Sequence, residues 1–99
     1  METQYINLIE GFNEWCYNHK LDGKTQIIFL KILFLKYLNN WLTWTEIPNV
    51  KLMYLSGISS EKTFIRHRDK LIELGFIEYQ KGKKGQANKY KINFKIINN

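Results

Sequence analysis

Apolar residues recur every three or four positions along residues 1–40 of the chain. Over residues 2–19 this spacing predicts an amphipathic helix with a buried stripe formed by Tyr5, Leu8, Ile9, Phe12, Trp15 and Cys16. Asp22 is the candidate N-cap of a second helix over residues 24–39. This second helix is apolar around nearly its whole circumference, so it has to be covered on all sides. We therefore expect part of its surface to contact another copy of the chain.

Strand-forming residues predict three short strands in the rest of the chain. The first, Trp41–Ile47, is rich in Trp, Thr and Ile and is ended by Pro48. The other two, residues 76–81 and 89–95, flank the glycine-containing segment 82–88 and form a hairpin with a flexible tip. Alternation in the last strand predicts that Tyr90, Ile92 and Phe94 face inward, and that Lys89, Lys91, Asn93 and Lys95 face outward.

Two further helices are predicted between the first strand and the hairpin. Residues 50–56 form a short helix, and a longer helix follows and runs to Leu74. Residues typical of helix ends stand at the boundaries: Asn49 as N-cap, Gly57 as the first end, Ser59 or Ser60 as the second N-cap, and Gly75 after the last turn. The predicted order is helix, helix, strand, helix, helix, strand, strand, which is an α+β architecture.

The length and composition indicate one domain. The chain has 99 residues, of which 44% are hydrophobic and 24% charged, so it can form one core and not two. We divide this domain, residues 1–99, into a helical part at 1–40 and a part at 41–99 that holds the last two helices and the hairpin. Cys16 is the sole cysteine, which excludes an intramolecular disulfide. The chain starts without signal-peptide features and its longest apolar stretch is too short for a bilayer, so we expect no membrane contact and a cytoplasmic location.

The positive charge of the chain is confined to its second half. With 15 basic and 9 acidic residues, the net charge is +6. Residues 1–50 hold four lysines and five acids, a balance of −1, whereas residues 51–99 hold eleven basic residues and four acids, a balance of +7. A localised excess of this kind indicates a surface for a polyanion such as nucleic acid.

A short helix, a tight turn, a longer helix and a β-hairpin are the parts of a winged helix-turn-helix, and their chemistry suits duplex DNA. The major groove accepts one α-helix, whose first residues reach base edges. Arginine can hold guanine or phosphate as a fork, and Ser and Thr hydroxyls suit phosphate oxygens. The candidate DNA-binding residues are Ser59, Ser60, Lys62, Thr63, Arg66, His67 and Lys70 at the longer helix, and Lys81, Lys83, Lys84 and Lys89 on the hairpin. Arg68 falls on the buried stripe of the same helix, so we expect its stem to pack and its head to pair with a carboxylate or a carbonyl.

Several short motifs of the second half resemble winged-helix domains of bacteria and their phages. They are Leu55-Ser56-Gly57-Ile58-Ser59, Lys62-Thr63-Phe64, Arg66-His67-Arg68, the run from Lys70 to Ile77, and the run from Gly85 to Ile92. The chain is most similar, over nearly its whole length, to the N-terminal domain of DnaD-like replication initiation proteins and phage replisome organizers. This resemblance implies a domain that binds DNA and self-associates through its N-terminal helices and hairpin. In such proteins a separate C-terminal domain helps to load the replicative helicase, so we expect no helicase loading from these 99 residues.

Two other functions would use the same features. A transcriptional repressor of the winged-helix type would use the same surface to occupy one palindromic operator. A protein-assembly module would use the hairpin and the Leu- and Phe-rich helices to build an oligomer, without binding DNA.

Other chemistry has weaker support in the sequence. Paired catalytic carboxylates, a Ser/His/Asp set and a phosphate-binding glycine loop are not found, so we expect neither catalysis nor a cofactor. Cys16 and His19 lie one helical turn apart, but zinc needs further ligands, so we expect a buried thiol and a surface imidazole. Trp41 and Trp44 could stack on single-stranded DNA, yet we expect both, or at least Trp44, to pack the first strand onto the helices.

Overall fold

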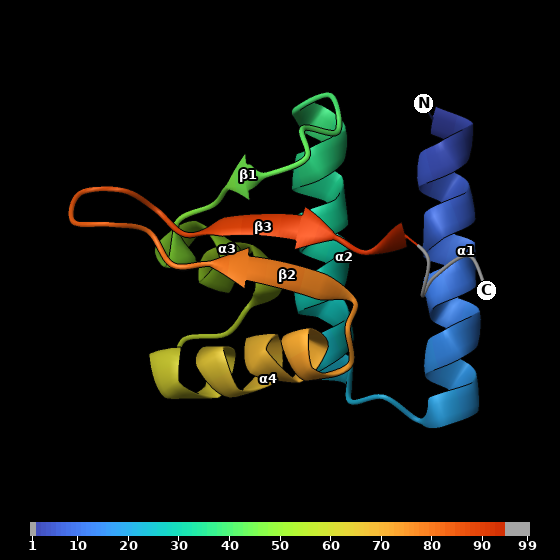
Figure 1. Cartoon of the computed structure of the whole chain (residues 1–99). Coiled ribbons are helices and arrows are strands. Elements are labelled where there is room, and N and C mark those ends of the chain that lie inside the picture. Colours follow the sequence, from blue (N-terminus) through green and yellow to red (C-terminus); the bar gives the residue numbers. More distant parts are fainter. Residues whose placement is uncertain (1, 95–99) are drawn as a thin grey trace.

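Figure 1 shows an α+β structure in which helices pack against a small antiparallel sheet. The computed structural model describes residues 2–94. Within them the elements are α1 (Glu2–His19), α2 (Gly23–Leu38), β1 (Thr45–Glu46), α3 (Asn49–Ser56), α4 (Glu61–Glu73), β2 (Ile77–Gln80) and β3 (Lys89–Ile92). This order is the one that the sequence predicts, and it is compatible with a winged-helix layout.

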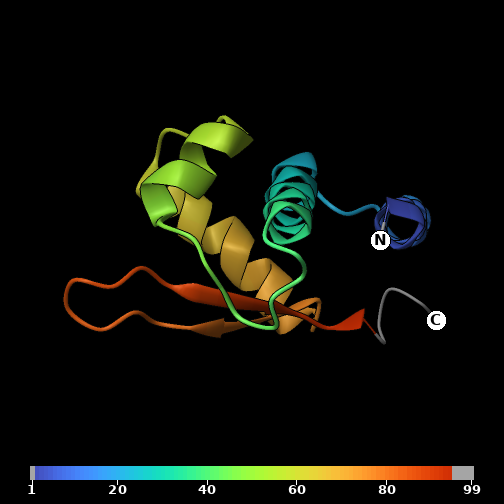
Figure 2. The ribbon, with the colours of Figure 1, turned by 90° about the horizontal axis from the view of Figure 1, so that it is seen from above.

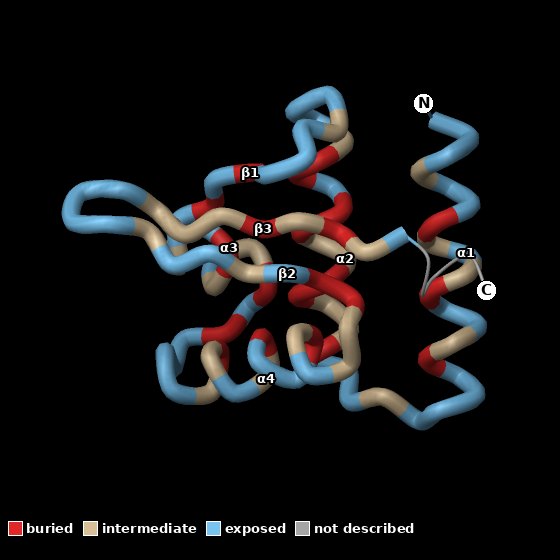
Figure 3. Tube along the Cα trace, viewed as in Figure 1, coloured by how far each residue is buried: buried red, intermediate tan, exposed pale blue. Residues whose placement is uncertain are grey.

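Helix α2 lies at the centre of the helical layer. Figure 2 shows α1 on one side of α2, α3 and α4 on its other side, and the sheet beneath. The buried positions in Figure 3 follow this arrangement, and those of α2 include Ile28, Phe29, Ile32 and Leu33. One chain therefore covers most of α2, but it does not cover the helix on all sides. Phe34 and Leu38 remain exposed, and self-association through α1 and α2 stays a prediction.

Four of the predicted helix boundaries are confirmed. The Asp22 carboxylate and the Ser60 hydroxyl each accept a hydrogen bond from a backbone amide of the following turn, at 2.8 and 3.2 Å. Gly57 and Gly75 have φ values of 69° and 85°, in the left-handed region that favours glycine after a helix. Asn49, in contrast, is not an N-cap, because α3 begins at this residue and its side chain is bonded to another segment.

The three strands form one sheet in the order β1-β3-β2, with all neighbours antiparallel. Tyr90 and Ile92 of β3 are buried, as the alternation predicts, whereas Phe94 lies beyond the strand and is 37% exposed, so its predicted inward position is wrong. Lys89 and Lys91 are half-buried on the alternate side. Lys95, predicted to face outward on this strand, lies outside the described residues.

Strand β1 is much shorter than the predicted strand Trp41–Ile47. Only two residues pair with β3, because Trp41 and the residue before it turn the chain with positive φ values of 59° and 56°. The ring of Trp41 packs near Tyr5 and Phe94, with centroids 6.0 and 6.3 Å away. Trp44 is 38% exposed. The prediction that Trp44 packs onto the helices is therefore wrong, and Trp41 is the tryptophan that packs.

The buried side chain of Lys36 ties the turn before β1 to α2. Lys36 is 2% exposed, and its ammonium donates hydrogen bonds to the carbonyl oxygens of Leu42 and Thr43 and to the hydroxyl of Thr45, at 2.9, 3.0 and 2.9 Å. An ammonium has three donors, so each of them has an acceptor. Burial nevertheless lowers the pKa of Lys36 to about 8. One side chain thus fixes the segment that leads from α2 into the sheet.

Replacing Lys36 by methionine keeps the approximate length of the side chain and removes a donor from three acceptors. Of these, within the described residues, only the Leu42 carbonyl oxygen still accepts another hydrogen bond, from the Thr45 hydroxyl at 3.3 Å. We expect Lys36→Met to lower the free energy of unfolding by about 2–4 kcal/mol, because unsatisfied buried groups cost more than the removed charge relieves. Urea unfolding followed by tryptophan fluorescence measures the change. Lys31→Met, at a half-buried position of the same helix, is the control. Equal unfolding midpoints for the two variants would contradict the claim that the hydrogen bonds of Lys36 stabilise the fold.

The lowered pKa of Lys36 also predicts how stability changes with pH. Below pH 8 the folded chain holds the charged amine, and the burial of that charge opposes folding. Between pH 8 and the ordinary value of 10.5, the folded chain has lost a proton that the unfolded chain keeps. The free energy of unfolding of the wild type, relative to Lys36→Met, should therefore rise with pH by up to about 1.4 kcal/mol per unit. Unfolding curves across this window test the prediction, and a constant difference between the two proteins would refute it.

Candidate nucleic-acid interface

The start of α4 and the loop between β2 and β3 lie at the same end of the molecule. Figure 1 shows both on the left, with α1 at the opposite side. We call the loop, residues 81–88, the wing. At the start of α4, Ser59, Ser60 and Lys62 are exposed and Thr63 is half-buried. The first turn of a helix also has free backbone amides. This turn can therefore offer hydroxyls, amides and an ammonium to a ligand that also reaches the wing.

The base of the wing is held by hydrogen bonds, whereas the flexibility of its tip stays a prediction. Asn88 Oδ1 accepts a hydrogen bond from the Gly82 amide across the loop, at 2.9 Å. The Ala87 amide donates to Glu46 Oε1 of β1, at 3.1 Å. A Cβ atom at Gly82 would collide with the carbonyl oxygen of Gln86, so the two arms approach too closely for a side chain at this position. The wing therefore has a defined shape in which glycine is required.

The wing surrounds a hollow of about 310 Å³ with a cationic lining. The lining residues are Gln80, Lys81, Gly82, Lys83, Gln86 and Lys89, and none of them has a carboxylate. Ammonium groups bind phosphate as point charges, and carboxamides add neutral N–H donors. The structure thus brings together three of the predicted site residues, Lys81, Lys83 and Lys89. Lys84 is exposed at the tip, beside this hollow.

Ion pairs leave an excess of positive charge on the wing, whereas at the start of α4 the charge of Lys62 is accompanied by that of Glu61, which forms no ion pair among residues 2–94. Three of the four acids in residues 51–99 pair with a nearby cation: Asp69 with Arg68, Glu73 with Lys70, and Glu78 with Lys91, at 3.2, 3.8 and 3.7 Å. Within residues 2–94, no acidic side chain forms an ion pair with Lys62, Lys81, Lys83, Lys84 or Lys89. The lysines in and beside the wing therefore carry positive charge with which no acid of the described residues pairs.

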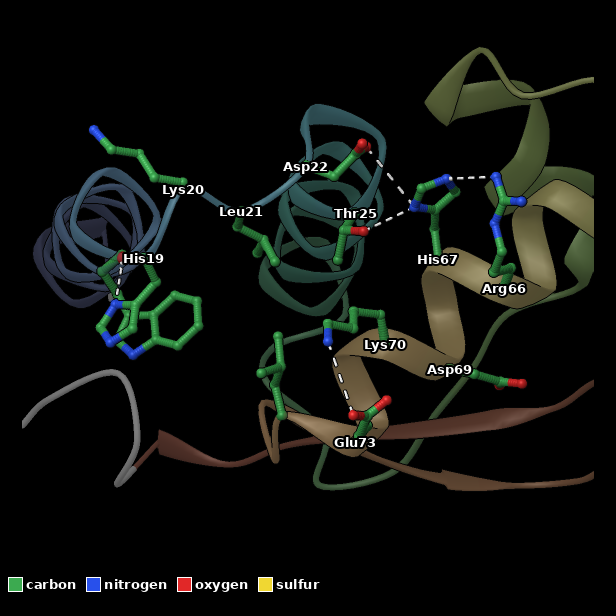
Figure 4. A pocket seen from close by; sticks show the side chains of 12 residues that line it. His19, Lys20, Leu21, Asp22, Thr25, Arg66, His67, Asp69, Lys70 and Glu73 are labelled. Carbon is green, nitrogen blue, oxygen red and sulfur yellow. Dashed lines mark hydrogen bonds and ion pairs between the residues drawn. The ribbon is translucent and has the colours of Figure 1, made fainter.

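Arg66, His67 and Lys70 line a second hollow, of about 690 Å³, between α4 and the turn that joins α1 to α2 (Figure 4). Lys70 pairs with an acid on its own helix, and Arg66 is exposed at the rim. Three cationic and three acidic side chains line this cleft: Lys20, Arg66, Lys70, Asp22, Asp69 and Glu73. Its charge is balanced, so it lacks the attraction for a polyanion that the wing has.

His67 does not face the predicted DNA surface. Its side chain is 12% exposed, and Nδ1 lies 2.9 Å from the hydroxyl oxygen of Thr25 and 3.8 Å from Asp22 Oδ1. Figure 4 shows the imidazole between these α2 residues and Arg66. The sequence places His67 one position after Arg66 and does not reveal this contact with α2. His67 therefore connects α4 to α2 by a hydrogen bond and is not placed to reach a base.

Arg68 is buried, as its place on the apolar stripe predicts. It is 6% exposed, and its Nε and Nη2 atoms donate to Asp69 Oδ1 at 3.3 and 3.2 Å. Its guanidinium also lies over the ring of Tyr79, 4.2 Å from the centroid. The expectation that the stem packs and the head pairs with a carboxylate is confirmed.

The remaining candidates of the sequence behave as ordinary core and surface residues. Cys16 is 4% exposed, and burial raises the pKa of its thiol to about 11. His19 is exposed and stacks on Trp15, with 3.9 Å between ring centroids. Among the described residues, no three His, Cys, Asp or Glu side chains are grouped so that they could hold a metal ion. Over the same residues, no helix combines the length and the apolar character needed to cross a membrane.

Three polar residues in or next to the wing are absent from the predicted site. Gln80 and Gln86 line the hollow, and Asn88 closes its base. An Asn near the end of a glycine-containing loop is a visible signal for a side chain that bonds to backbone. Its second partner is Asn49, which lies 39 positions away in the chain, so local sequence could not identify the pairing.

No family model matches the sequence, and comparisons with curated proteins and with solved structures give no significant match. The geometry and electrostatics of the wing and α4 are therefore the basis for a functional assignment.

Gly82→Ala should disturb the wing, because the added methyl group would collide with the carbonyl oxygens of Gln86 and Ala87. We expect a loss of about 1–3 kcal/mol in the free energy of unfolding. Amide hydrogen exchange in residues 81–88 should also become faster. Gly23→Ala is the matched control, because open space surrounds its Cβ position. Unchanged exchange in the wing of Gly82→Ala would contradict the close approach of the two arms.

Proposed function

We propose that the chain is a winged-helix domain that binds duplex DNA, with α4 in the major groove and the wing on the adjacent backbone. The observation that carries this proposal is the cationic hollow of the wing, at the same end of the molecule as the first turn of α4 (Figure 1). A major groove about 12 Å wide accepts one α-helix, and a neighbouring phosphate strand is then within reach of a hairpin. One duplex can therefore contact both elements.

In this proposal the first turns of α4 read the groove and its rim. The hydroxyls of Ser60 and Thr63 and the free amides suit phosphate oxygens, and Lys62 adds a point charge. Arg66 is exposed one turn later, and its guanidinium has the fork geometry that guanine accepts. Glu61 repels the backbone, but its carboxylate can accept a hydrogen bond from a cytosine amine. Orientation and base selection are thus assigned to α4.

The wing supplies the part of the affinity that is independent of sequence. Lys81, Lys83 and Lys89 surround one hollow, which suits a phosphate group approached from several sides. Lys84 extends the cationic surface to the tip. Lys70 is paired with Glu73, so we assign it a weak contact at most.

On the sequence resemblance described above, we further propose a role like that of DnaD-like replication initiation proteins and phage replisome organizers. Such a protein coats or remodels origin DNA with low specificity, whereas a repressor occupies one palindromic operator. Footprinting on origin and operator fragments separates the two. Extended protection supports the replication role, and a single palindromic footprint would replace it with repression.

Affinity for duplex DNA should fall steeply with salt. With about 4–6 phosphates contacted per protomer, the slope of log K against log salt should be about −4 to −5. Lys83→Ala with Lys84→Ala should weaken binding to all sequences alike and make the slope shallower by about 1–2. Anisotropy of a labelled duplex measures both quantities.

A matched control for this experiment is Lys20→Ala with Lys24→Ala, which removes the same charge from exposed positions near the turn between α1 and α2. This control should keep the wild-type slope. Absent or salt-insensitive binding by the wild type would refute the proposal. A stable assembly in ultracentrifugation, together with absent DNA affinity, would favour the protein-assembly module.

Arg66→Ala tests whether α4 reads bases. We expect a loss of about 1–3 kcal/mol on the preferred sequence and a weaker preference among sequences, because a guanine contact is lost. Competition binding with a randomised duplex measures the preference. Lys70→Ala, on the same helix, should leave the preference unchanged. A uniform loss over all sequences would show that Arg66 contacts phosphate instead.

A further inference from the structure

Asn88 is the residue at which the wing, β1 and α3 are joined. Its Oδ1 accepts from the Gly82 amide at 2.9 Å, and its Nδ2 donates to Asn49 Oδ1 at 3.0 Å. Its own carbonyl oxygen accepts from the Ile47 amide at 2.9 Å. These bonds lead to three separate segments: the opposite arm of the wing, the first residue of α3, and the connection from β1 to α3. We call the two side-chain bonds of Asn88 the latch.

The latch acts where the regular hydrogen bonds of the sheet have ended. The last pair of β2 and β3 is Gln80 with Lys89, so residues 81–88 lie beyond the ladder. A loop that is ordered only on binding loses conformational entropy and therefore affinity. Lys81 and Lys83 of the wing and Lys89 of β3 also line one hollow, where their like charges repel each other in the absence of an anion. The loss of entropy and the charge repulsion both disfavour the arrangement that a phosphate needs, and the latch counteracts both.

We propose that Asn88 is a positioning residue for the DNA backbone: the latch fixes the wing relative to α3, so that Lys81, Lys83 and Lys89 surround a single phosphate. This inference rests on the proposed function. Asn88 acts through the three lysines and makes no DNA contact of its own. Asn49 is the partner of Asn88 in this role. Its hydrogen bond connects the wing to the helical layer, in which α3 and α4 both pack on α2.

The first measurement needs no DNA. Asn88→Ala removes the latch, so the Gly82 and Ala87 amides should exchange about tenfold faster, while the core helices keep their protection. Asn49→Ala removes only the bond to α3, so the Gly82 amide should stay protected. Asn18→Ala, at an exposed position of α1, is the control with the same chemical change.

The second measurement is binding to a labelled duplex over a range of salt. Asn88→Ala should bind about tenfold more weakly and with a slope shallower by about 1, because the lysines no longer share a phosphate. Asn49→Ala should lose about threefold. In a background with Lys81→Ala, Lys83→Ala and Lys89→Ala, adding Asn88→Ala should change affinity by less than about twofold. A residue that merely supports the fold would alter the melting temperature and leave the slope unchanged.

Two results would overturn the positioning role. One is unchanged exchange of the Gly82 and Ala87 amides in Asn88→Ala. The other is an equal loss of affinity from Asn88→Ala with and without the three lysines, since Asn88 would then act elsewhere. Absence of duplex binding by the wild type would instead refute the proposed function and, with it, the use of the latch for DNA. The exchange measurement would still decide whether the latch orders the wing.

Discussion

The hydrogen bonds of the buried Lys36 ammonium determine the path of the second half of the chain. Lys36 holds the turn after α2 by two carbonyl oxygens and by the Thr45 hydroxyl, so β1 starts at a fixed place. From β1, Glu46 bonds to one arm of the wing and the next residue bonds to Asn88. A buried charge is tolerated when all its donors are satisfied. The hydrogen bonds of this buried α2 side chain are thereby connected, through β1, to the exposed loop at the end of the sheet (Figure 1).

The helical layer positions α4 by a different set of contacts. Capping by Ser60 sets where the helix begins. Two of its polar side chains turn inward: Arg68 lies over the ring of Tyr79 in β2, and His67 bonds to Thr25 in α2. The side chains that remain outward at the start of α4 are the ones suited to DNA. The wing and α4 are therefore oriented by separate networks, and the bond from Asn88 to α3 is a direct connection between the wing and the helical layer.

The features that sequence could predict are those set by near neighbours. Periodicity and capping chemistry identify the helices, their glycine ends and the burial of Arg68, because each depends on residues within about one turn. The predictions that were wrong concern residues whose partners lie far away in the sequence. Asn49 bonds 39 positions away and His67 bonds 42 positions away, and the segment that leads into β1 is held by Lys36 of α2. An Asn at the start of a helix is a typical N-cap in sequence, but here the fold places Asn88 beside Asn49 as the partner of its side chain.

The two hollows differ in the charge of their linings, and this difference says more about where an anion would bind than the net charge of the chain does. The cleft beside α1 has cations and acids in equal number, whereas the hollow of the wing is lined by lysines and carboxamides alone. Gathering like charges raises the free energy of the folded state, and the hydrogen bonds at the base of the wing restrain the loop against this repulsion. Any anion that enters the hollow removes that repulsion and stabilises the wing in turn. In the proposed function, the hydrogen bonds that restrict this exposed loop also favour a phosphate beside it, so the cationic loop and its polar base act together.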